Sequence, residues 1–172
     1  MAANTNRLNT GALYSDASTI EGFHGTTLPY PGTLGHFYES NGKKFQLVKL
    51  DSTGIQGVVG HAVAWLDFDD FTVTNDISES SINFPAGVLA SAAAVGEYCF
   101  IQVRGPVTVK TDGGDDITAG DMLILDPTTD GTVDSVTAAA TGAIVPLGFA
   151  TASDVDTLDT VAAILTVTLN GA

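Results

Sequence analysis

The chain has 172 residues, of which 44% are hydrophobic, and it carries 20 Asp and Glu against 6 Lys and Arg. This length suits one domain, or one domain with an arm, and the hydrophobic content is too high for a chain that is disordered throughout. The acidic balance repels phosphate groups, so binding to nucleic acid or to an anionic membrane is disfavoured, and no run of about 18 apolar residues is present to span a bilayer.

Residues 1–43 are predicted to form an extended arm, because they are polar, are interrupted by Gly and Pro, and lack helix or strand periodicity. The first residues also lack the basic start and apolar run of a signal peptide. Five aromatic side chains in the arm need buried surroundings. They are Tyr14, Phe23, Tyr30, Phe37 and Tyr38. We expect them to anchor the arm in a neighbouring subunit or a capsid, and one arm segment to add a strand to a partner's sheet edge. Packing on the chain's own β domain is the alternative.

Residues 44–172 are predicted to form an all-β domain, either an antiparallel barrel or a sandwich. Short apolar runs recur between turn residues, which is typical of many short strands. The run "CFIQV" places Cys99, Ile101 and Val103 on one face, and the single cysteine is expected to be a small buried side chain. "HAVAWLDF" and "MLILD" are apolar on both faces, so we expect the core to cover one face and a second cover, such as a neighbouring subunit, to bury the other.

The domain contains the same pattern twice, in residues 45–105 and 106–170. "VKLDSTGIQGVVGHAVAWLD" and "VKTDGGDDITAGDMLILD" both run from Val-Lys through a loop and a glycine to an apolar strand that ends in Asp. "PAGVLASA" and "PLGFATAS" recur at a similar offset. The sequence therefore predicts two similar halves that close into one barrel or sandwich.

The acidic loop "DGGDD" could be a calcium site or a turn. Its counterpart in the first half keeps only Asp51, and the spacing does not fit an EF-hand, so the loop is predicted to be a turn. We accordingly expect no metal at its aspartates or at the aspartate of the next turn. These residues are Asp112, Asp115, Asp116 and Asp121.

No group of residues predicts catalysis or a cofactor. The histidines at 24, 36 and 61 do not have the spacing of a zinc site. "FDD" at 68–70 follows an apolar strand and is predicted to be a polar hairpin loop rather than a catalytic carboxylate pair. Gly-x-Ser-x-Gly and a phosphate-binding glycine loop are both missing from the sequence. We expect neither an enzyme nor a bound cofactor.

Residues 43–170 resemble a group of tailed-bacteriophage virion proteins, of the head decoration or cement type. The resemblance lies in "VAWLDFDDFTVTNDISES", "PAGVL", "GEYCFIQVRGPVTVKTDG", "ITAGDMLILD", "DGTVD" and "PLGFA". It implies a β-rich homotrimer that is made in the host cytoplasm, binds the major capsid protein on the outside of the head, and stabilises the shell. It carries no catalytic residues over to this chain, and residues 1–42 match nothing in the group.

Two other classes remain open at this stage. One is an adhesin or tail-associated module that binds carbohydrate, although the single tryptophan, Trp65, lies in an apolar strand. The other is a trimeric β-barrel enzyme, which would need basic residues for phosphate, and the only basic residues in or next to the second half are Arg104 and Lys110.

Overall fold

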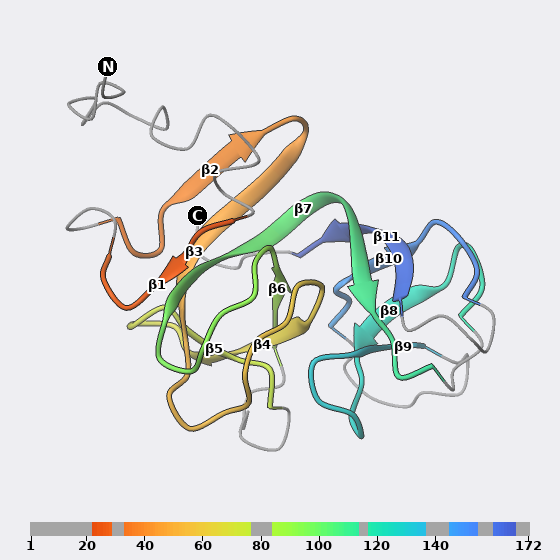
Figure 1. Ribbon diagram of the computed structural model, residues 1–172. Coiled ribbons are helices and arrows are strands. Elements are labelled where there is room, and N and C mark those ends of the chain that lie inside the picture. The colour runs from red at the N-terminus through yellow and green to blue at the C-terminus, as the bar shows by residue number, and fades with distance from the viewer. Residues whose placement is uncertain are drawn as a thin grey trace.

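The computed structural model describes residues 22–28, 33–76, 84–113, 117–136, 145–154 and 160–167. Within these ranges the protein is all-β, as predicted, and its 11 strands form one hydrogen-bonded system (Figure 1). The strands are β1 (His24–Gly25), β2 (Phe37–Ser40), β3 (Lys43–Leu50), β4 (Ala62–Asp67), β5 (Thr72–Thr74), β6 (Pro85–Leu89), β7 (Tyr98–Lys110), β8 (Met122–Leu125), β9 (Val133–Ser135), β10 (Gly148–Ala150) and β11 (Thr160–Thr166). In this part of the chain, no helix has the length and apolar character needed to cross a membrane.

The first half is a closed barrel built from β3, β4, β5, β6 and β7. Strand β3 pairs in parallel with β5, and antiparallel pairs join β5 to β4, β4 to β6 and β6 to β7. Strand β7 then returns to β3 and closes the ring. Because a closed ring has no free edge, these strands need no partner from another chain to complete their ladders.

The second half repeats this order of pairings. Antiparallel pairs join β7 to β11, β11 to β10, β10 to β8 and β8 to β9. A parallel bridge between Thr111 and Val133 connects the end of β7 to β9, and the parallel pair Leu50–Val73 has the same place in the first half. Strand β7 is therefore the last strand of the first half and the first strand of the second.

Strand β4 is apolar at successive positions because both of its faces are buried. Val63 and Trp65 belong to the core of the first half, whereas Ala62 and Ala64 pack with the core of the second half. The second cover of this strand is therefore the chain's own second half, not the neighbouring subunit that the sequence suggested.

Cys99 is a buried side chain of the first core, where it packs with Ile101 and Val103 as predicted. Burial, with a smaller contribution from the charge of Glu97, raises the pKa of the Cys99 thiol to about 12. Because the thiolate is the reactive form, this thiol is unreactive at neutral pH.

Two short stretches of the predicted arm belong to the sheet of their own chain. Strand β2 pairs with β3, from Phe37 opposite Gln46 to Ser40 opposite Lys43. Strand β1 pairs with β7 at Cys99 and Tyr98. For these residues, the strand pairing that we expected on a partner's sheet edge is made within the chain.

His61 lies where the two halves meet. Its Nδ1 atom is 3.0 Å from the side-chain nitrogen of Asn75, and that amide group also donates a hydrogen bond to the carbonyl oxygen of Gln56. Because the amide nitrogen is a donor, Nδ1 accepts and the imidazole is neutral in this arrangement. Burial lowers the pKa of His61, and the positive charge of Lys110 lowers it further.

We predict that His61 makes the fold less stable as the pH falls below about 6.5. The unfolded histidine binds a proton near pH 6.5, whereas the folded one resists protonation until a lower pH, so acid favours the unfolded state over that interval. In urea unfolding between about pH 7 and 5, His61→Gln should show a smaller fall of the midpoint than the wild type. The exposed His36 gives the control, because His36→Gln should keep the wild-type slope. Equal slopes for His61→Gln and the wild type would contradict the assignment.

Gly105 marks the point at which β7 passes from one half to the other. Its φ is +95°, and a Cβ atom there would lie 2.6 Å from the carbonyl oxygen of Gly42 and 3.1 Å from the Cα atom of Lys43. Both are backbone atoms of the β2–β3 hairpin, so the hairpin would have to shift to admit any side chain.

We predict that Gly105→Ala destabilises the protein more than Gly120→Ala. Gly120 has a similar φ of +100°, but its Cβ would meet nothing within 4 Å, so its substitution measures the backbone strain alone. That strain should cost about 1–2 kcal/mol, and the backbone clash at Gly105 should add roughly 1–3 kcal/mol. The free energies of unfolding of the two variants in urea provide the comparison. Equal losses of unfolding free energy in the two variants would show that the β2–β3 hairpin does not pack tightly against Gly105.

Candidate functional site

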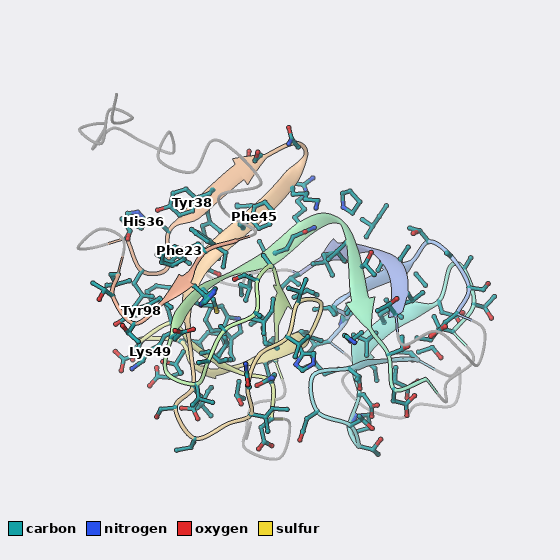
Figure 2. All side chains as sticks on the ribbon, in the orientation of Figure 1. Phe23, His36, Tyr38, Phe45, Lys49 and Tyr98 are labelled. Atoms are coloured by element: carbon teal, nitrogen blue, oxygen red, sulfur yellow. The ribbon has the colours of Figure 1, made fainter. Side chains whose placement is uncertain are left out.

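Two of the five arm aromatics pack on the first half of their own chain. Phe23 and Tyr38 each meet the ring of Phe100 edge to face, with centroid distances of 5.8 Å and 5.3 Å. Phe45 belongs to the same cluster, and Figure 2 shows Phe23 and Tyr38 beside it. Burial raises the pKa of Tyr38. These two side chains therefore pack on the chain's own β domain, which was the alternative to anchoring in a partner.

Polar contacts fix the segment around Phe23. The carbonyl oxygen of Phe23 accepts a hydrogen bond from the Ser91 hydroxyl at 2.6 Å. One carboxylate oxygen of Glu97 lies 3.1 Å from Nδ1 of His24 and accepts the backbone amide of Ala94 at 2.8 Å. Together with the β1–β7 pairing, these contacts attach the segment around Phe23 to the first half.

Phe37 has the opposite orientation and faces solvent. Its side chain is 39% exposed, and Nζ of Lys44 lies 4.3 Å from the ring centroid. An exposed ring next to a cation suits a contact with another molecule better than a role in the core. Tyr14 and Tyr30 lie outside the described residues, so their role as anchors stays a prediction.

A hollow of about 360 Å³ opens at the tip of the β2–β3 hairpin. We call it the basic hollow, because Lys43, Lys44 and Arg104 contribute to its lining. Its other lining residues are Glu39, Ser40, Asn41 and Gly42. The five basic residues of the described part of the chain all lie on β3 and β7, and three of them meet here.

The strand register places like charges side by side in the basic hollow. Lys44 lies opposite Arg104 on β7, and Glu39 lies opposite Lys44 on β2. Two cations on directly opposite residues destabilise a sheet, and one carboxylate offsets only part of that cost. An acidic group from a partner would relieve the remaining repulsion, so the basic hollow is suited to an anionic surface.

Lys43 and Lys44 were not among the site residues predicted from the sequence, although the sequence contains a signal for the turn that precedes them. Asn41-Gly42 between two strands is the strongest short hairpin signal, and the φ values of 50° and 78° at these residues fit the two-residue turn that this dipeptide favours. The turn presents the two lysines at its exit. Their approach to Arg104 depends on the β3–β7 pairing, which has no local signal in the sequence.

The aspartates for which we expect no metal are only partly described. Asp115 and Asp116 lie outside the described residues, and Asp121 accepts the backbone amide of Thr118 at 2.8 Å, as a turn residue does. In the matching loop of the first half, Asp51 accepts the amides of Thr53 and Gly54. Across the described ranges, no three His, Cys, Asp or Glu side chains gather where they could hold a metal ion.

We predict that Phe23→Ala loosens the segment around residue 23, because it removes the edge-to-face contact with Phe100. Amide hydrogen exchange of residues 22–28 should become roughly tenfold faster, which corresponds to about 1.4 kcal/mol. Phe37→Ala is the matched control, because the same change at an exposed ring should leave this exchange unchanged. Identical exchange in both variants would contradict an anchoring role for Phe23.

Comparison with known proteins shows a structural likeness to a bacteriophage protein. No family model matches the chain, and no curated protein matches it. The fold is similar to the N base of head fiber gp8.5 in bacteriophage phi29, a crystal structure with 17% sequence identity and a TM-score of 0.46. The alignment covers 71% of this chain and 92% of that one.

Proposed function

We propose that this chain is a structural protein of a bacteriophage virion, a decoration protein that binds the outside of the head and stabilises its shell. Its partners in this proposal are the major capsid protein and two further copies of itself in a homotrimer. The sequence resemblance to head decoration proteins supports this role. Where the structure describes them, the runs that carry the resemblance fall on the strands and turns of the two halves, so the resemblance concerns the β domain itself.

The observation that carries the proposal is the basic hollow with Phe37 beside it. On a chain with 20 acidic and 6 basic residues, the hollow concentrates three cations next to an exposed aromatic ring. Aromatic and cationic side chains together are typical of the energetically important part of a protein interface. The residues that precede the anchored Phe23 would add the remaining contacts, as proposed for the arm of residues 1–42.

Binding of this kind stabilises a shell by mass action. A protein that contacts several neighbouring capsid subunits gains its binding free energy only on the assembled lattice, so it shifts the equilibrium towards assembly. In a trimer, the first contact brings the other two near their sites, and modest single affinities become a nearly permanent attachment. The acidic surface outside the hollow keeps the protein away from nucleic acid and soluble before it binds.

The carbohydrate-binding alternative receives no support from the tryptophan. Trp65 is 3% exposed and packs in the first core, so its face cannot stack on a sugar. We assign no catalytic step to the chain.

We predict that Lys44→Glu weakens binding to heads that lack this protein, roughly tenfold, or about 1.4 kcal/mol for each site. Lys49→Glu is the matched control, because Lys49 lies on the same strand but outside the basic hollow, and it should bind as the wild type does. Removal of residues 1–21 should also weaken binding, and this deletion leaves β1 and β2 in place. The longer deletion of residues 1–42 would remove Phe23 and Tyr38 from Phe100 and so confuse attachment with folding.

Co-sedimentation with undecorated heads over a range of protein concentrations gives the affinities. Unchanged affinity for both Lys44→Glu and the deletion would show that neither the hollow nor the arm attaches the protein. Equal weakening by Lys44→Glu and Lys49→Glu would show that the overall charge, not the hollow, determines binding.

A further inference from the structure

The two halves of the chain differ in what covers the outer face of two equivalent strands. In the first half, Ala62 on β4 lies opposite Val88 on β6, and both are buried in the core of the second half. In the second half, the equivalent pair is Met122 on β8 and Phe149 on β10. The outer face of the first half is therefore covered within the chain, whereas Phe149 is 41% exposed.

The exposed face of the second half is a row of apolar residues across four strands. Met122 lies opposite Phe149, Phe149 opposite Ile164, and Ile164 opposite Pro106. Ile164 is 45% exposed, and Pro106 is exposed as well. We call this row the outer wall. Its strands β7, β8, β10 and β11 contain no Asp or Glu, although the chain is strongly acidic.

A second exposed apolar feature lies on the hairpin between β4 and β5. Phe68 is 49% exposed, and its ring rests on Trp65 and Phe84 with centroid distances of 5.3 Å and 6.5 Å. The hairpin is held by Asp67, whose carboxylate accepts the backbone amides of Asp69 and Asp70. We call Phe68 the aromatic knob. It is surrounded by exposed aspartates, and its supports are in place before any partner binds.

We propose that the outer wall of one copy of this chain binds the aromatic knob of the next copy, in a head-to-tail contact. Each surface is apolar, and the charges beside them are complementary. Lys110 and Arg104 lie on β7 at either end of the stretch that holds Pro106, whereas Asp67, Asp69 and Asp70 accompany the knob. A second copy is therefore the partner that the surface chemistry of this chain fits, and the contact deepens the homotrimer part of the proposed function.

The two surfaces lie on different parts of the molecule, so one copy can use both at once. In Figure 1, β5 lies on the left of the molecule and β8, β10 and β11 lie on the right. A contact between two different surfaces of identical copies is heterologous, and it forms a ring when the rotation between neighbours closes. Each copy then uses its wall once and its knob once, and no wall stays exposed.

The test uses the full chain with Phe149→Ser, which alters the wall, and Phe68→Ser, which alters the knob. Sedimentation equilibrium should show that each variant alone dissociates at concentrations about tenfold or more above those at which the wild type does. Val95→Ser, which changes an apolar side chain that is 43% exposed and lies outside both the wall and the knob, should assemble like the wild type. Ile164→Thr repeats the wall test with a residue that favours strands, in case Phe149→Ser folds poorly.

Mixing the two variants identifies the geometry. The intact knob of Phe149→Ser can still bind the intact wall of Phe68→Ser, so an equimolar mixture should form one-to-one pairs that neither variant forms alone. If the wall variants dissociate while Phe68→Ser assembles normally, the wall of one copy binds the wall of another, and the head-to-tail proposal is wrong. A wild-type chain that stays monomeric at micromolar concentration, or that assembles equally well in every variant, would overturn the inference entirely. Attachment to heads is measured separately, so neither result decides the role of the basic hollow.

Discussion

Strand β7 is the element on which the rest of the structure depends, because its hydrogen bonds serve both halves. Its first part pairs with β1, β3 and β6, and its second part pairs with β11. Gly105 stands between these parts, where only a glycine lets the strand pass the backbone of the β2–β3 hairpin. The residue on one side, Arg104, lines the basic hollow, and the residue on the other, Pro106, belongs to the outer wall. One strand therefore fixes how the two candidate surfaces lie relative to each other.

Charge is divided between the turns and the strands of this protein. Asp51 and Asp126 follow a strand and Asp67 ends one, and each accepts two backbone amides of the turn that it begins. Burial raises the pKa of Asp51 and of Asp126, but hydrogen bonds to the turn outweigh this effect and the pKa of both is lowered. These carboxylates thus accept hydrogen bonds from backbone amides that would otherwise lack partners. The five cations of the described residues lie on β3 and β7, and strand pairing gathers three of them in the basic hollow.

The two halves have the same order of strand pairings but different surroundings. The outer face of β4 and β6 has small side chains, Ala62, Ala64 and Val88, and the second half packs on it. The equivalent strands carry Met122 and Phe149, which are larger and partly open to solvent. A protein that must bind a lattice and also bind its own copies needs two surfaces with different chemistry. Two halves with the same strand pairings but different side chains can provide these two surfaces.

The sequence by itself determined the all-β class and indicated the strands and turns, because alternation and turn residues are local properties of the chain. It also predicted that the strand within "HAVAWLDF" is buried on both faces, which holds for residues 62–65. Only the tertiary structure decided what buries it, since the packing of Ala62 and Ala64 on the second half joins residues far apart in the sequence. The same holds for Phe23 and Tyr38, which the sequence marked as needing cover and which the fold places on Phe100. Lys44 and Arg104 meet for the same reason, because register between distant strands follows from the closed barrel and leaves no pattern in either segment alone.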